Sequence, residues 1–269
     1  FLFQRKSVPA AKVCTKLLSV FVMRLPGVSF AKPADVGLDA ETLEDHRKRA
    51  SFHLQRGVYP GKVECVIKDN KVAYFELIGF SDAEGKVPMT EHTLFRGFSM
   101  TKSVIGVAVL ILAEEGRLSI KHPVGKYIPS WKNVVVVRPD FSDDPSVKSS
   151  DLEKVESPRR PVTLGHLLMH TSGLGYGPMK PGPSSEKRPR ASDITEQVYR
   201  RLSARCDSGD ITSLAQFVDE LARIPLRFQP GTQCLYGYGV DVVGRVIEIV
   251  SGKPLKQFLQ ERVFEPLGF

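Results

Sequence analysis

The 269-residue sequence lacks any apolar run long enough to cross a bilayer. The longest run, from Val104 to Ala113, covers ten positions and includes a glycine, whereas a membrane-spanning helix needs about 20 apolar residues. No transmembrane segment is therefore predicted. Hydrophobic residues make up 42% of the chain and charged residues 25%. This ordinary balance excludes disordered and collagen-like chains and predicts a packed core.

Cysteine is scarce, and its spacing carries no motif. The chain holds Cys14, Cys65, Cys206 and Cys234, with no Cys-x-x-Cys pair. This pattern excludes a disulfide framework and a zinc site of the usual spacing, and it favours a reducing compartment. His166 and His170 are four residues apart on a predicted helix, but neither a glutamate nor a third ligand accompanies them. We expect neither a metal nor an organic cofactor.

Acidic residues are missing from the first 34 positions, which hold six basic residues. Residues 35–269 carry 32 basic and 30 acidic residues, so most of the formal charge of +8 belongs to the N-terminus. A nearly neutral body does not indicate a nucleic-acid partner.

The N-terminal stretch, residues 1–34, is predicted to be a leader or extension before a domain at 35–269. Its basic, acid-free composition resembles a transit peptide and favours a mitochondrion or plastid. Leu17–Met23 could instead belong to a secretory signal, although Arg24 is poorly placed for one. An ordinary extension of a cytoplasmic protein is the third alternative.

The first part of the domain predicts one helix and a β-hairpin. Residues 39–56 are typical of a helix capped by Asp39. Residues 62–68 and 71–79 alternate in polarity around the turn pair Asp69-Asn70, which predicts two paired strands.

The rest of the domain predicts helices and loops. Apolar periodicity and capping signals predict helices over residues 101–115, 213–223, 240–250 and 255–264. Ser213 and Gln216 form the pattern of a capping box. Residues 138–161 and 175–193 have loop compositions. The fold class is therefore predicted as α+β, with a helix and hairpin followed by a mainly helical region.

Ser-x-x-Lys occurs three times, and only one copy has a suitable context. Ser29…Lys32 runs into a proline, and Ser184…Lys187 lies in a proline-rich stretch. Ser99 and Lys102 begin a long apolar helix, where residues three apart share a face.

Ser99 and Lys102 have the chemistry of a nucleophile and its base. The positive end of the helix dipole favours negative charge on the Ser99 oxygen. Apolar neighbours such as Phe95, Phe98 and Ile105 would desolvate Lys102 and lower its pKa. The structural alternative is that Ser99 caps the helix while Lys102 extends into solvent.

Several ordered blocks resemble the serine β-lactamase and penicillin-binding-protein superfamily, most closely class C β-lactamases and the related carboxylesterases. The blocks are Tyr59-Pro-Gly, Pro88-Met-Thr, Thr93-Leu-Phe-Arg-Gly-Phe-Ser-Met-Thr-Lys, Glu115-Gly-Arg-Leu-Ser-Ile, Val124-Gly-Lys-Tyr-Ile-Pro, Val162-Thr-Leu-Gly-His-Leu-Leu-Met-His-Thr-Ser-Gly-Leu and Gln229-Pro-Gly-Thr. The resemblance covers about residues 39–269. It implies the β-lactamase/transpeptidase-like α+β fold, with Ser99 as the nucleophile.

The same resemblance places a second motif at Tyr236. The family tyrosine is thought to move protons with the lysine, so Tyr236 joins Ser99 and Lys102 as a predicted catalytic residue. Tyr238 stands where the β-lactamases carry an asparagine that contacts substrate and the lysine. We therefore assign Tyr238 to substrate binding. A phenol at this position favours ester substrates over β-lactams. Gly237-x-Gly239 faintly resembles a dinucleotide loop, but its spacing is wrong for one.

Together these features predict a serine hydrolase that acts through an acyl-enzyme on a small ester, with amide or β-lactam substrates less favoured. The competing prediction is a non-catalytic relative that serves as a binding or assembly protein. The resemblance also implies that further strands of the sheet, one with a third motif, lie beyond residue 269. On that basis we expect residues 1–269 alone to be nearly inactive and prone to aggregate.

Overall fold

The computed structural model describes residues 29–141, 148, 150–151, 153–176 and 196–268, which form two compact units. The described residues up to Arg96, with Leu267 and Gly268, make up the first unit, and Gly97–Pro266 the second. Residues 1–28 lie outside the described residues, so the leader and its destination stay predictions. Cys14, Ser184 and Lys187 lie outside them as well.

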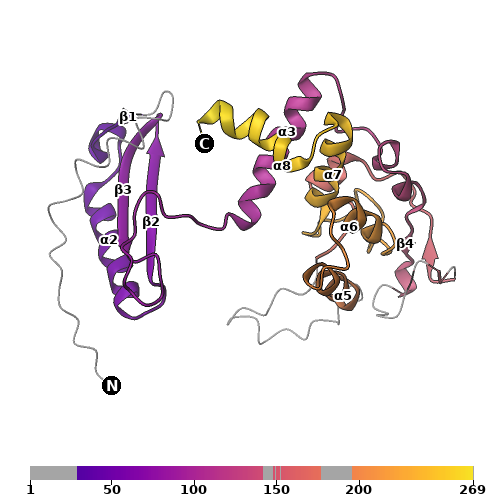
Figure 1. Ribbon diagram of the computed structural model, residues 1–269, viewed down its shortest axis with the longest axis horizontal. Coiled ribbons are helices and arrows are strands. Elements are labelled where there is room, and N and C mark those ends of the chain that lie inside the picture. Colours follow the sequence, from indigo (N-terminus) through magenta and orange to yellow (C-terminus); the bar gives the residue numbers. More distant parts are fainter. Residues whose placement is uncertain (1–28, 142–147, 149, 152, 177–195, 269) are drawn as a thin grey trace. The chain divides into compact units, whose positions relative to one another are not determined.

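The first unit is a small sheet with one helix along it (Figure 1). Strands β2 (Gly61–Lys68) and β3 (Lys71–Gly79) pair in antiparallel fashion, and the short strand β1 (Ser29–Phe30) pairs with β3 in parallel. Helix α2 (Ala40–Gln55) packs on β3. The predicted helix and hairpin are therefore confirmed. Strand β1 falls within the segment predicted as a leader, and the boundary at residue 34 stays a prediction.

Local sequence explains these elements. The Asp39 carboxylate accepts a hydrogen bond from the Thr42 backbone N–H at 2.9 Å and so caps α2. Asp69 and Asn70 have φ angles of +51° and +56°, the left-handed pair that a tight two-residue hairpin turn requires.

The second unit is mainly helical, and α7 lies at its centre (Figure 1). Its helices are α3 (Thr101–Glu114), α4 (Leu164–Leu168), α5 (Glu196–Asp207), α6 (Leu214–Leu221), α7 (Gly239–Ser251) and α8 (Leu255–Leu259). Helices α3, α4, α6 and α8 all pack against α7. No helix in the described parts of the chain is both long and apolar enough to span a membrane.

The core of this unit joins α3 to α7. Ala108, Val109 and Leu112 of α3 are fully buried, as are Val243 and Ile247 of α7. Burial of these side chains stabilises the unit by roughly 1.5–3 kcal/mol for each large aliphatic residue. It also fixes the beginning of α3 relative to the loop that precedes α7.

Several details differ from the sequence predictions, and helix α5 (Glu196–Asp207) is one element that was not predicted. Strands β4 (Val136–Val137) and β5 (Val155–Glu156) were not predicted, because two residues are too few to show alternation. Ser213 caps α6 as predicted, but the Gln216 side chain accepts from Thr212 instead of Ser213, so the capping box is only half formed. The last predicted helix ends at Leu259 and continues as a π-helical turn, Gln260–Phe264.

Candidate active site

Ser99 lies in the 3-10 turn Phe98–Met100, immediately before α3. The turn places Ser99 at the positive end of the helix, as the sequence predicted. Phe98, directly before it, has a φ of +42°, a conformation that residues other than glycine seldom adopt. Ser99 is exposed to solvent, so its hydroxyl is accessible to a substrate.

Lys102 lies three residues further along and is surrounded by tyrosine rings. Its Nζ is 4.8 Å from the ring centroid of Tyr236 and 5.7 Å from that of Tyr176, both within the range of cation–π attraction. The apolar surround predicted for Lys102 is formed only in part, because Ile105 is buried whereas Phe95 and Phe98 are 61% and 75% exposed. The two tyrosine rings are neighbours of the ammonium group that the sequence did not predict from its apolar pattern.

Tyr236 is held against residues 170–176 by backbone hydrogen bonds. The N–H of Leu235 donates to the His170 carbonyl at 2.8 Å, and the N–H of Tyr238 donates to the Gly175 carbonyl at 3.2 Å. These bonds flank Tyr236 on both sides. The two segments therefore position the Tyr236 ring jointly.

Two glycines permit this close approach. A Cβ at Gly237 would lie 2.4 Å from the carbonyl oxygens of Leu174 and Gly175, and one at Gly239 would lie 2.6 Å from the Leu167 carbonyl oxygen. Real side chains do not fit at such distances. These two glycines therefore serve chain packing, which agrees with rejection of the dinucleotide-loop alternative.

Ser99 and Tyr236 meet directly: the Ser99 Oγ is 2.6 Å from the Tyr236 hydroxyl oxygen. Hydrogen bonding to Lys102, and then to Ser99, lowers the pKa of the Tyr236 phenol from its ordinary value. A lower pKa raises the population of the phenolate near neutral pH, and the phenolate is the form that can accept the Ser99 proton. The structure thus brings together all three residues predicted as catalytic.

Tyr238, the predicted substrate-binding residue, lies in an aromatic cluster beside these three. Its ring stacks on Tyr176 at a centroid distance of 4.2 Å and 13° between planes. Phe217 meets it edge-on at 5.2 Å, and Tyr199 lies at 5.6 Å. Burial raises the pKa of Tyr238 to about 12, so its phenol stays neutral. Its assignment to substrate binding stays a prediction.

Tyr176 is a site residue that sequence reasoning missed. Its ring lies 5.9 Å from that of Tyr236 and stacks on Tyr238. Burial raises the pKa of the Tyr176 phenol, against the opposing charge of Lys102. Its position two residues after the His-Thr-Ser-Gly-Leu block was the available signal.

Asp241 was missed as well. It is half-buried in the first turn of α7, and burial raises the pKa of its carboxyl group while the Lys102 charge opposes that rise. The signal was an acidic residue in the first turn of the predicted helix, five positions after Tyr236.

Metal ligation has no support among the described residues, in which no group of three or more His, Cys, Asp or Glu side chains comes together to hold an ion. His166 instead caps α4, where its Nδ1 accepts from the Thr163 N–H at 3.2 Å. His170 packs on Tyr236, with ring centroids 4.6 Å apart.

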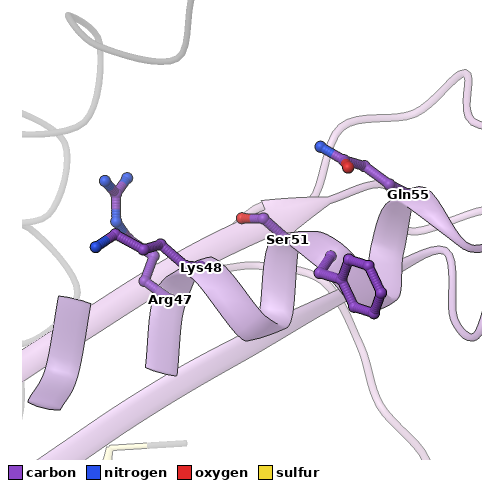
Figure 2. A pocket seen from close by; sticks show the side chains of 5 residues that line it. Arg47, Lys48, Ser51 and Gln55 are labelled. Carbon is purple, nitrogen blue, oxygen red and sulfur yellow. The ribbon is translucent and has the colours of Figure 1, made fainter. Parts of the chain in front are cut away.

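A hollow of about 250 Å³ lies in the first unit, along α2 (Figure 2). Arg47, Lys48, Ser51, Phe52 and Gln55 line it. Arg47 and Lys48 are paired with Glu44 and Asp45 at 2.8 and 3.2 Å. None of the predicted catalytic residues lines this hollow, and we assign it no chemistry.

The fold and the Ser–Lys–Tyr arrangement define a protein of the serine β-lactamase and penicillin-binding class. Residues 42–269 match the family described as Beta-lactamase, and the chain belongs to that family. The resemblance and the α+β fold class inferred from the sequence are therefore confirmed.

Relatives of known name include esterases. Esterase EstB of Burkholderia gladioli is 34% identical over 240 residues, which are 88% of this chain and 53% of that protein. Lovastatin esterase of Penicillium rubens is 34% identical over 170 residues, 63% of this chain and 37% of that protein. The chain spans about half the length of EstB and less of the fungal enzyme.

Solved structures show the same fold. The structure of EstCE1, described as a hydrolase with promiscuous acyltransferase activity, is similar with a TM-score of 0.63 and 26% identity, over 85% of this chain and 52% of that one. Simvastatin synthase from Aspergillus terreus is similar in fold with a TM-score of 0.62 at 22% identity, over 86% of this chain and 54% of that one.

Proposed function

We propose that this protein is a serine hydrolase that cleaves small esters through an acyl-enzyme on Ser99. The observation that carries the proposal is the 2.6 Å hydrogen bond between the Ser99 Oγ and the Tyr236 hydroxyl, with Lys102 beside the tyrosine ring. A weak nucleophile needs an adjacent base to become reactive, and this pair supplies one.

The proton path follows from the contacts. Ser99 Oγ attacks the ester carbonyl and passes its proton to the Tyr236 oxygen, whose ionised form the Lys102 ammonium stabilises. Tyr236 then returns that proton to the departing alcohol oxygen as the acyl–oxygen bond breaks. Water, activated by the same tyrosine, hydrolyses the acyl-enzyme. The Ser99 N–H, at the beginning of α3, is the oxyanion donor that this chain supplies.

Preference for esters rests on the aromatic cluster. Where β-lactamases carry an asparagine that contacts the substrate amide, this chain has Tyr238, whose ring stacks on Tyr176. Without that amide, the site loses a hydrogen-bonding partner for an amide substrate. The names of the relatives EstB and Lovastatin esterase point in the same direction.

The test uses the complete protein, a fluorophosphonate probe and short-chain nitrophenyl esters. We expect the probe to label Ser99 and both labelling and turnover to disappear in Ser99→Ala. Ser103→Ala, an exposed serine of α3, is the matched control and retains both. Folded protein with neither labelling nor turnover would instead favour the alternative, a non-catalytic binding or assembly protein.

A further inference from the structure

Two strained residues lie at the candidate site. Four described residues other than glycine have positive φ angles, and Asp69 and Asn70 are explained by the hairpin turn. The others are Phe98, which precedes the nucleophile, and His170, with a φ of +57°. Such conformations cost about 1–3 kcal/mol each and concentrate at functional sites. His170 therefore requires an explanation.

The His170 side chain packs on the catalytic tyrosine. Its ring centroid is 4.6 Å from that of Tyr236, with 40° between the planes. Its Nδ1 is buried and has no hydrogen-bond partner among the described residues. A hydrogen bond to Nδ1 therefore does not determine where the ring lies, whereas its packing on the Tyr236 ring restrains it.

The His170 backbone ties the same tyrosine to α4. Its N–H donates to the Leu167 carbonyl at 3.2 Å, and its own carbonyl accepts from the Leu235 N–H at 2.8 Å. The left-handed conformation allows both bonds while the ring turns toward Tyr236. The His170 backbone thus binds Leu235, and its side chain packs on the next residue, Tyr236.

The His170 imidazole is uncharged where it packs on the Tyr236 ring. Burial, and then the Lys102 charge, lower the pKa of its imidazole, so the ring is neutral near pH 7. A neutral ring packs against Tyr236 and adds no second cation beside Lys102.

We propose that His170 is a positioning residue: its imidazole ring fixes the plane of the Tyr236 ring, so that the phenol oxygen stays within hydrogen-bond distance of the Ser99 Oγ. The inference rests on the proposed function, because the effect of this placement is seen in turnover. It assigns His170 no direct contact with the substrate.

Three variants of the complete protein separate the ring from the backbone. His170→Phe keeps a flat ring but disfavours the left-handed backbone, whereas His170→Asn and His170→Gly suit that backbone and remove the ring. We expect His170→Asn and His170→Gly to lose about 10–100-fold in kcat with KM unchanged, because small misplacements of catalytic groups are costly. His170→Phe should retain most of kcat.

Stability is measured separately. Melting temperatures are recorded for each variant, and kcat is normalised to the endpoint of Ser99 labelling by a fluorophosphonate, so that unfolded protein does not count. His166→Asn, which alters a histidine of α4 that caps the helix, is the matched control. It should lower the melting temperature and leave the normalised kcat unchanged.

The outcomes are distinguishable. If His170→Asn keeps the wild-type kcat, or if His170→Phe loses as much as His170→Asn, the ring does not position Tyr236 and the inference is wrong. If the wild-type protein shows no Ser99-dependent turnover, the proposed function fails and this inference fails with it.

Discussion

Ser99 and Tyr236 are 137 positions apart in the sequence, yet their hydroxyl oxygens lie 2.6 Å apart. Ser99 lies in the turn directly before α3 and Tyr236 on the loop before α7, and these two helices share the buried core of the second unit. The packing of α3 on α7 is therefore what assembles the candidate nucleophile and its base.

Removal of the Tyr236 hydroxyl tests this pairing. We expect Tyr236→Phe to lower kcat for a nitrophenyl ester by about 10²–10⁴-fold, the usual contribution of a general base, with KM little changed. Tyr127→Phe is the matched control, because Tyr127 forms a hydrogen bond of equal length to His122 away from the site. Equal losses in the two variants would show that the Tyr236 effect is not catalytic.

The pH profile tests the role of Lys102. The Lys102 ammonium lowers the pKa of Tyr236, so kcat/KM should rise with pH through a value below the ordinary phenol pKa of about 10. In Lys102→Met the positive charge is gone, and this rise should move to higher pH. Lys126→Met is the control, because Lys126 lies 5.7 Å from a different tyrosine ring, that of Tyr127. An unmoved profile in Lys102→Met would contradict the proposed proton path.

Substrate preference gives the third prediction. Because Tyr238 replaces the amide that β-lactamases use, we expect the complete protein to turn over short-chain nitrophenyl esters with a much higher kcat/KM than nitrocefin. Both substrates are measured with the same preparation, and Ser99→Ala supplies the background rate. Comparable values for the two substrates would overturn the ester preference.

The aromatic cluster around Tyr238 should also contribute to stability. Tyr238→Asn removes ring contacts with Tyr176, Tyr199 and Phe217, each worth about 0.5–1.5 kcal/mol. We expect the free energy of unfolding to fall by roughly 2–4 kcal/mol, as measured by denaturant titration. Phe52→Asn, at an exposed position, should change it by less than about 0.5 kcal/mol. A stable Tyr238→Asn variant would mean that these rings contribute little.

Two leucines of α3 make a paired stability test. Leu112 is fully buried and Leu110 is 54% exposed. Leu112→Ala should cost about 2–5 kcal/mol because it leaves a cavity in the core, whereas Leu110→Ala should cost well under half as much. Similar losses, measured by thermal unfolding, would contradict the described packing of α3.

Local chemistry explains what the sequence could predict. Ser99 and Lys102 are three residues apart on one helix, so their proximity follows from helix geometry alone. Likewise, Asp39 caps the helix that directly follows it, and Asp69-Asn70 forms the turn between two adjacent strands. Tyr236 could be chosen only through the family resemblance, because nothing local relates it to Ser99.

Tertiary contacts explain what the sequence could not predict. Tyr176 approaches Lys102 because the segments around residues 175 and 238 are joined by hydrogen bonds. The left-handed backbone of His170 depends on partners at Leu167 and Leu235. Neither relationship has a periodic or compositional signature.

The tight packing at Gly237 and Gly239 has a consequence for redesign of the substrate range. Because backbone atoms alone fill the space around these glycines, the path of the loop does not depend on the side chain between them. Variation at positions 238 and 176 therefore leaves the backbone path of the loop in place, although loss of the aromatic contacts described above lowers stability. A side chain at either glycine would clash with backbone atoms and displace the loop. Most members of a library that also varies the two glycines would therefore fail to place Tyr236 beside Ser99.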